Sequence, residues 1–345
     1  MNAILLPSYG GPEVLTYADV PDPTLRPGEA LVRVRACGVT HFDLDIRAGV
    51  SRLPIRLPHV LGRDMAGDVV AVAGATQPAV GSRVVAPLHL TCMLATCPFC
   101  STGRDNLCPQ RVHPGVDTPG NYAELAVYPA ASLLPLPEHL SYADAVAGLQ
   151  TFATALHVLV TLLAVQPGET VLITGAAGGV GLAAVQVARL AGARVIAAAG
   201  ADRKLDAVQR LGVAAGDCVN YATHDLAAEV RRRTDGRGID AVMEIVGGEV
   251  FLAALDALAI DGRLGVTGAH GGEVVPINLV DLFRRQARLM GSSAYTHAEV
   301  RRALALMAAG TLRAPLGHSL PLAAAAEAHR LLAARANIGK IVLLP

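Results

Sequence analysis

The segment at residues 170–204, TVLITGAAGGVGLAAVQVARLAGARVIAAAGADRK, decides the fold of this chain. It begins with a short apolar run, passes through a turn of small residues, and continues as an apolar-periodic stretch at 182–190. Gly192 then precedes a second apolar run at 194–198. This order predicts a strand, a glycine turn, a helix and a second strand, which together form one βαβ unit.

The turn itself carries a G-x-G-x-x-G pattern with alanine in the first position. Small residues there permit a tight turn, let the backbone approach a pyrophosphate, and let the helix pack against the strand. The helix N-terminus adds free N–H groups and a positive dipole end. We therefore predict a dinucleotide site rather than an ordinary glycine-rich turn. Its predicted residues are Ala176, Gly178, Gly179, Val180 and Gly181.

The tip of the second strand indicates which dinucleotide binds. NAD-selective sites place an acidic residue about 20 residues after the glycines, where it bonds the ribose hydroxyls. Here the strand ends in small residues at 199–201, and Asp202 on the turn is followed at once by Arg203 and Lys204. An uncharged strand end beside two cations suits a 2′-phosphate. We therefore expect NADPH, the alternative for Lys204 being a solvated charge at the start of a helix.

Length and composition limit the other classes of function. The 345 residues, 52% of them hydrophobic, suffice for two domains that fold without disulfides. Zero net charge, 3% aromatic residues and no Trp argue against nucleic acid as a partner. Apolar runs such as 158–165 fall short of the roughly 18 residues that span a bilayer, and residues 1–7 do not resemble a leader peptide. We expect a cytoplasmic protein with a small-molecule substrate and no membrane partner.

The pattern of elements changes twice along the chain. Residues 1–148 alternate short strands with Pro- and Gly-bearing turns, which predicts an antiparallel, barrel-like domain. Residues 149–293 alternate strands with helices, which predicts a doubly wound parallel sheet of the Rossmann type. Residues 294–345 are assigned to the first domain. The predicted strands of the parallel sheet are 171–174, 194–198, 217–220, 240–245, 263–267 and 288–292; the tail is predicted to hold helices at 298–309 and 323–334 and a strand at 341–344.

Over its whole length the chain resembles the medium-chain dehydrogenases/reductases, which include zinc alcohol dehydrogenases and zinc-free quinone and enoyl reductases. The segments that carry the resemblance are GGPEVL at 10–15, PGEALV at 27–32, ACGV at 36–39, GSRV at 81–84, GNYAE at 120–124 and AAGGVG at 176–181. The resemblance implies a GroES-like catalytic domain beside a Rossmann domain, and a homodimer or homotetramer.

The glycine turn has the form found in the quinone reductases, and the resemblance extends to the cofactor. In that group 2′-phosphate binding is carried by positions that match Gly200, Lys204, Tyr221 and Arg335, and all four residues are present. Thr154 is also assigned to cofactor binding. His41 matches a position that touches the pyrophosphate, although it could equally be a surface histidine. The resemblance thus implies NADPH.

The positions that hold catalytic zinc in the alcohol dehydrogenases are occupied here by Thr40, Arg63 and Gln150. Zinc prefers thiolate, imidazole or carboxylate, and a guanidinium would repel it, so we expect no catalytic zinc. These three residues are our candidates for donors to an oxyanion in the vacated pocket. Each also has a purely structural alternative, since Arg63 could pair with Asp43 or Asp64.

Four cysteines indicate a separate, structural metal. Cys92, Cys97, Cys100 and Cys108 have the spacing C-x4-C-x2-C-x7-C, similar to the structural zinc lobe of the alcohol dehydrogenases except that the first gap is two residues longer. Four thiolates can form a closed tetrahedral site that stabilises a loop with little core. We predict structural Zn²⁺, with free thiols as the alternative.

These features together predict an NADPH-dependent reductase without catalytic zinc. Hydride addition to a quinone, enone or enoyl thioester places charge on an enolate or phenolate oxygen, which modest hydrogen-bond donors can stabilise. Two alternatives remain at this stage: a zinc-type alcohol dehydrogenase with substituted ligands, and a non-catalytic NADPH-binding protein.

Overall fold

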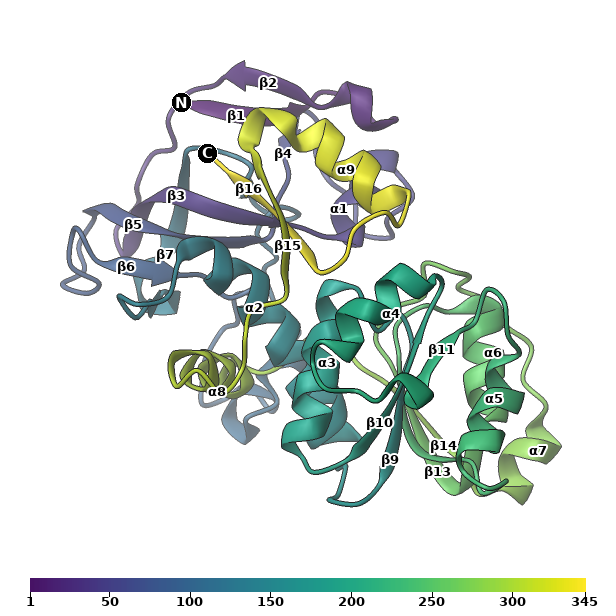
Figure 1. Ribbon diagram of the computed structural model, residues 1–345. Coiled ribbons are helices and arrows are strands. Elements are labelled where there is room, and N and C mark those ends of the chain that lie inside the picture. Colours follow the sequence, from purple (N-terminus) through teal and green to yellow (C-terminus); the bar gives the residue numbers. More distant parts are fainter. The chain divides into compact units, whose positions relative to one another are not determined.

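The computed structural model describes residues 1–345, which divide into two compact units (Figure 1). Unit 1 comprises residues 1–150 and 300–345, and unit 2 comprises residues 151–299. The sequence placed these borders at 148/149 and 293/294. The structure moves both into helices, α2 (Tyr142–Leu156) and α8 (His297–Ala308), and an uninterrupted helix carries no turn signal from which a border can be predicted.

Unit 2 contains a six-stranded parallel sheet with the strand order β11-β10-β9-β12-β13-β14. This is the doubly wound arrangement, in which the order reverses beside the first strand. All six predicted strands are confirmed, although β13 begins five residues before the predicted start at 263. The strands are β9 (Thr170–Ile173), β10 (Arg194–Ala199), β11 (Cys218–Asn220), β12 (Ile239–Glu244), β13 (Leu258–Val266) and β14 (Arg288–Gly291).

Helices cover both faces of this sheet. Figure 1 shows α3 and α4 on one side and α5 and α6 on the other. The second side holds a continuous apolar core in which Ile196 and Val242 of the sheet and Ala254 of α6 are fully buried. Hydrophobic burial of this kind is the main term that holds the layers together. The helices are α3 (Gly179–Leu190), α4 (Asp202–Gln209), α5 (Leu226–Arg233), α6 (Gly248–Asp256) and α7 (Leu279–Arg284).

Unit 1 is built on two sheets, as the barrel-like prediction required. The larger has the order β15-β16-β3-β5-β6-β8 with β7 also paired to β3, and the smaller has the order β2-β1-β4. Every pairing is antiparallel except that of β15 with β16. The strands are β1 (Asn2–Leu6), β2 (Thr16–Asp19), β3 (Glu29–Val39), β4 (His59–Val60), β5 (Asp64–Val72), β6 (Arg83–Val85), β7 (Leu125–Pro129), β8 (Leu134–Pro135), β15 (Leu316–Pro321) and β16 (Lys340–Leu344).

Helix α1 (His41–Ala48) directly follows β3 and was not predicted. It begins with a capping box in which Thr40 and Asp43 exchange side-chain and backbone hydrogen bonds, and it ends at Gly49 in the left-handed conformation. Helix α9 (Ala325–Ala333) lies close to its predicted position in the tail. The short 3-10 helices are η1 (Pro12–Val14), η2 (Cys100–Thr102), η3 (Asp105–Leu107), η4 (Ala130–Ser132), η6 (Ala215–Asp217) and η7 (Leu322–Ala324).

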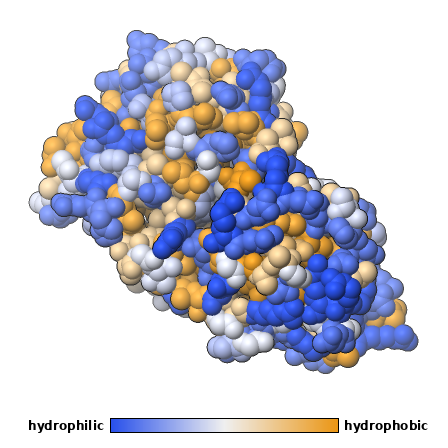
Figure 2. Space-filling view, viewed as in Figure 1, coloured by the Kyte–Doolittle hydropathy of each residue, from blue (hydrophilic) through white to orange (hydrophobic).

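The stretch Tyr142–Leu162 is one continuous helical segment, in which α2 runs on into the π-helical turn η5 (His157–Leu162). Contrary to the sequence reading, it is long and apolar enough to cross a bilayer, with a mean hydropathy of 1.6. Within the structure 78% of its most apolar window is buried, and the core helix of a soluble protein passes the same test. The face shown in Figure 2 mixes hydrophilic and hydrophobic residues.

Candidate functional site

The glycine turn joins β9 to α3 and has the geometry of an anion site. Gly178 precedes the helix, and no side chain caps the first N–H groups of α3, which are therefore available to a ligand. A Cβ atom at Gly181 would lie 2.3 Å from the carbonyl oxygen of Gly175, so only glycine fits there. A Cβ at Gly178 would lie 3.6 Å from the carbonyl oxygen of Gly175, an ordinary van der Waals distance, so this position is not crowded. These residues fit a bound pyrophosphate.

A buried glutamate braces this turn from the neighbouring strand. Glu244 ends β12 and is fully buried, and its Oε1 accepts hydrogen bonds from the Thr174 hydroxyl at 3.0 Å and the Val246 N–H at 2.9 Å. Burial raises the pKa of this carboxyl, while the N–H groups of Gly247 and Val246 act in the opposite direction. Glu244 was not predicted from the sequence, in which its signal was a lone carboxylate at the end of an apolar strand.

Three of the four residues assigned to the 2′-phosphate lie in unit 2, beyond the end of β10. A Cβ atom at Gly200 would approach the ring of Tyr221 to 3.3 Å, so these two residues are immediate neighbours. Lys204 is half-buried in the first turn of α4. Arg335 belongs to unit 1, where it follows α9. Thr154 is a half-buried residue of α2 within unit 2.

In unit 1, Thr40 is the N-cap of α1. Its hydroxyl donates to Oδ2 of Asp43 at 2.7 Å and accepts from the Asp43 N–H at 3.3 Å. A hydroxyl has one proton, and Asp43 already receives it. In this geometry Thr40 can accept a hydrogen bond from a ligand but cannot donate one. His41, the first residue of the helix, is half-buried.

The two carboxylates near Thr40 find partners other than Arg63. Asp43 is fully buried and bound by Thr40, and burial raises its pKa. Asp64 at the start of β5 lies 2.9 Å from Nζ of Lys340, and both side chains are buried. Arg63 instead stacks on Phe42, with its guanidinium carbon 4.7 Å from the ring centroid.

Gln150 is buried on α2 in the same unit. Thr40, Arg63 and Gln150 offer a hydroxyl, a cation and an amide, which do not fit a zinc ion.

A second buried network lies beside α1 and connects Arg47, His329 and Tyr122. Nη1 of Arg47 lies 3.2 Å from Nδ1 of His329, and Nε2 of His329 lies 3.3 Å from the Tyr122 hydroxyl. Because a guanidinium only donates, Nδ1 must accept and Nε2 must carry the proton of a neutral imidazole. Burial, with Arg47 adding repulsion, lowers the pKa of His329 to about 3.

The four cysteines predicted to bind zinc converge. Their sulfur atoms all lie within 4.8 Å of one another, with Cys92 at 3.7 Å from Cys100 and 3.6 Å from Cys108. Tetrahedral coordination with bonds of about 2.3 Å separates sulfurs by about 3.8 Å, so the cluster fits zinc. Met93, which lies in the longer first gap, has a left-handed backbone with φ 50°. The N–H groups of Cys100 and Phe99 lower the pKa of Cys97 to about 7.

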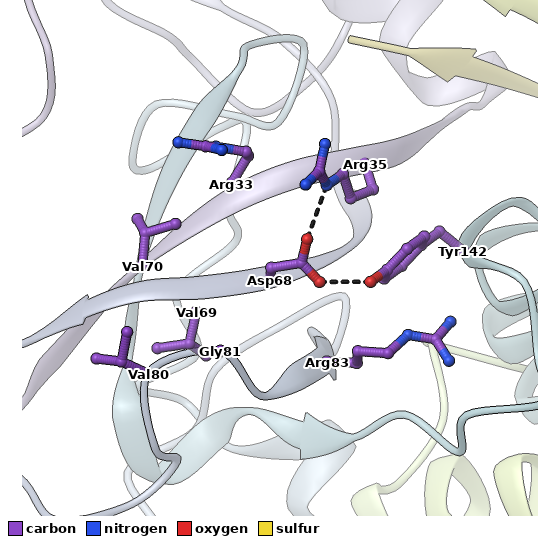
Figure 3. A pocket seen from close by; sticks show the side chains of 9 residues that line it. All are labelled: Arg33, Arg35, Asp68, Val69, Val70, Val80, Gly81, Arg83 and Tyr142. Carbon is purple, nitrogen blue, oxygen red and sulfur yellow. Dashed lines mark hydrogen bonds and ion pairs between the residues drawn. The ribbon is translucent and has the colours of Figure 1, made fainter.

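A hollow of about 560 Å³ in unit 1 is not lined by any of the predicted site residues (Figure 3). Asp68 accepts from Arg35 at 2.7 Å and from the Tyr142 hydroxyl, and Arg83 lies over the Tyr142 ring at 4.4 Å. These contacts brace the first turn of α2 against the sheet of unit 1. The hollow is lined by Arg33, Arg35, Asp68, Val69, Val70, Val80, Gly81, Arg83 and Tyr142.

Comparison with known proteins connects both units to one group of enzymes. Residues 26–138 match the alcohol dehydrogenase GroES-like domain, and residues 179–309 match the family described as zinc-binding dehydrogenase. A quinone oxidoreductase of Pseudomonas aeruginosa is 32% identical over 98% of each chain, and a 2-haloacrylate reductase of a Burkholderia species is 31% identical over 99% of this chain and 98% of its own. The solved structure of an NAD-dependent alcohol dehydrogenase is 41% identical, with a TM-score of 0.94 over the whole of both chains.

Proposed function

The chain belongs to the medium-chain dehydrogenase/reductase superfamily and to its quinone oxidoreductase-like branch. We propose that this oxidoreductase uses NADPH to reduce a conjugated carbonyl compound without catalytic zinc. One observation carries the proposal. The dinucleotide turn in unit 2 is complete, while the three zinc-ligand positions in unit 1 hold Thr40, Arg63 and Gln150.

The preference for NADPH rests on the residues beyond β10. The strand ends in Ala199 and Gly200 without an acid, and Lys204 and Tyr221 follow in the positions expected for a 2′-phosphate. A phosphate bound by a cation and a phenol gains charge-assisted hydrogen bonds that a ribose hydroxyl cannot make. The solved relative described as NAD-dependent makes NADH the competing choice, and measured affinities for the two cofactors decide between them.

The reaction follows from the groups that unit 1 supplies. When bound, NADPH would supply a hydride to one end of the conjugated system, and solvent would supply the proton that completes the product. The charge that develops on the carbonyl oxygen then needs a donor. Since the Thr40 proton is bound by Asp43, the donors we propose are the guanidinium of Arg63 and the amide of Gln150. A substrate such as a quinone, enone or enoyl thioester delocalises this charge, whereas a simple alcohol would require a localised alkoxide.

We also propose a structural metal in unit 1. Cys92, Cys97, Cys100 and Cys108 would hold one zinc ion, which supplies folding energy to their loop and takes no part in the reaction.

We also propose a cytoplasmic homodimer or homotetramer. Unit 2 exposes large apolar side chains, with Ile260 at 80%, Val274 at 90% and Phe283 at 68% of full exposure. Strand β14 is also at an edge of the sheet. Exposed apolar groups beside an edge strand favour association. Light scattering on the purified protein tests this assembly, and a mass equal to that of a single chain would contradict it.

A substrate screen tests the proposed function. Purified protein should oxidise NADPH in the presence of an enone or quinone panel and should not oxidise primary alcohols. A zinc-type alcohol dehydrogenase would show chelator-sensitive alcohol oxidation and about two zinc ions per chain. A non-catalytic NADPH-binding protein would bind the cofactor and turn nothing over.

A further inference from the structure

Asp202 and Asn220 are joined by a hydrogen bond at the edge of the proposed cofactor site. Asp202 is the first residue of α4, and Asn220 ends the neighbouring strand β11. Nδ2 of Asn220 lies 2.8 Å from Oδ1 of Asp202. The Oδ1 atom of Asn220 accepts from the N–H of Ala222 at 3.1 Å. That second bond fixes the orientation of the amide, so its NH₂ group must face the carboxylate.

Asp202 lies between two residues of the proposed 2′-phosphate site. It lies two residues after Gly200 and two before Lys204, which are both assigned to the 2′-phosphate. A free carboxylate in this turn could accept a hydrogen bond from the ribose 2′-hydroxyl of NADH. The same carboxylate would repel the 2′-phosphate of NADPH, since like charges a few ångströms apart at a protein surface interact by several kcal/mol before screening.

Asn220 is well suited to restrain this charge. Its side chain is buried at the end of a strand, whereas Asp202 is exposed, so a residue fixed by packing holds the solvent-exposed carboxylate. The amide is also neutral, and it engages the carboxylate without adding charge to the site.

We propose that Asn220 determines cofactor specificity by holding the Asp202 carboxylate against the end of β11, where it does not compete with a 2′-phosphate. Asn220 is a positioning residue in this scheme, because it acts through Asp202. The inference rests on the proposed use of NADPH.

The experiment measures the dissociation constants of NADPH and NADH by titration calorimetry for the parent and its variants. Asn220→Leu replaces the amide with an apolar group that has the same branching at Cγ, and we expect NADPH binding to weaken about five- to tenfold while NADH binding is unchanged or tighter. Adding Asp202→Asn to that variant should restore NADPH binding, because the released group is then uncharged. Asp206→Asn, which removes an exposed carboxylate from the same helix, is the matched control and should leave the ratio of affinities unchanged.

A second variant keeps the test decisive if Asn220→Leu does not fold. Asn220→Asp keeps the size and the acceptor for Ala222 but replaces the donor with a like charge, and it should also lower the preference for NADPH. Equal losses for both cofactors, or no recovery on adding Asp202→Asn, would overturn the inference. The parent alone tests the proposed function: a parent without NADPH preference contradicts both, whereas a selective parent that is insensitive to Asn220→Asp contradicts only the role of Asn220.

Discussion

Nζ of Lys340 lies 2.9 Å from Oδ2 of Asp64, and both side chains are buried in unit 1. Neither oxygen of Asp64 receives a well-directed hydrogen bond, so charge rather than geometry holds the pair. A Cβ atom at Gly38 would lie 2.7 Å from both Oδ2 of Asp64 and Cε of Lys340, which explains the glycine on β3. Lys340 is one of only two lysines in the sequence, the other being Lys204 in the proposed cofactor site.

Breaking this pair should destabilise unit 1. Lys340→Met leaves the Asp64 carboxylate buried without its cation, and we expect the free energy of unfolding to fall by about 3–5 kcal/mol. Adding Asp64→Asn should recover much of the loss, since the uncompensated charge is gone. Urea denaturation of the parent, the single variant and the double variant measures this. A double variant as unstable as Lys340→Met would show that the lysine acts through packing instead.

The buried His329 should make folding sensitive to acid. Its pKa is about 3 in the folded protein and about 6.5 in an unfolded chain, so between these values only the unfolded state takes up the proton. Stability is therefore lost as the pH falls from about 6.5 toward 3, by up to about 1.4 kcal/mol per pH unit. The pKa of Asp43, raised by burial, acts in the opposite direction.

His329→Gln isolates this contribution. The amide can still accept from Arg47 and donate to Tyr122 but does not titrate. Between pH 7 and pH 4, the free energy of unfolding should fall more steeply with decreasing pH for the parent than for the variant. Parallel curves would mean that the imidazole does not remain neutral in the folded state.

The sequence predicted unit 2 well because its signals are local. Each strand is a short apolar run, and the turn between 170 and 204 carries its own glycine pattern, so no distant contact was needed to place them. The parallel sheet and the clustering of the four cysteines follow from such patterns. The capping box at Thr40 and Asp43 was also a local signal for α1, but the residues were interpreted only by their place in the family.

Contacts between residues far apart in the chain could not be predicted from the sequence. Nothing near Asp64 indicates that its partner is Lys340 on the last strand, so Arg63 was offered as the candidate cation. The bond between Asn220 and Asp202 likewise depends on how β11 pairs with β10. The sequence suggested Thr40 as a donor to the substrate, whereas in the structure its hydroxyl donates to Asp43. The direction of a hydroxyl proton depends on which acceptor the fold places beside it, and that cannot be predicted from local sequence.

Lys204→Ala tests the cofactor preference directly. NADPH should bind the parent at least tenfold more tightly than NADH, because one charge-assisted contact to the phosphate contributes about 1.5–3 kcal/mol. Removing the ammonium should erase most of that difference and leave NADH affinity unchanged. Arg210→Ala, at the exposed cation that follows the last residue of α4, is the control for general charge effects. Equal affinities of the parent for both cofactors would contradict the assignment of NADPH.

The cysteine cluster should bind about one zinc ion per chain, as measured by elemental analysis. Cys100→Ser should lower the zinc content and the thermal stability while the affinity for NADPH changes little, because the cofactor residues lie elsewhere. Cys218→Ser, outside the cluster, is the matched control. A stoichiometry near two would revive the alcohol dehydrogenase alternative, and one near zero would argue for free thiols.

The final prediction concerns the group that stabilises the developing oxyanion. Arg63→Met keeps a long apolar side chain against Phe42 but removes the cation, and it should lower kcat/KM for an enone by about ten- to a hundredfold if the guanidinium donates to the oxygen. Thr40→Ser retains the N-cap and its bond to Asp43, and it should preserve both activity and stability.

Thr40→Ala separates the two roles of that residue. It should destabilise the fold by about 0.5–2 kcal/mol through the lost cap, while kcat at a temperature where the variant is folded changes little. A hundredfold loss of kcat in the folded Thr40→Ala variant, with Arg63→Met active, would mean that the hydroxyl leaves Asp43 and donates to the substrate. Chelators should leave turnover unchanged over short times, because no zinc ligand remains among these three positions.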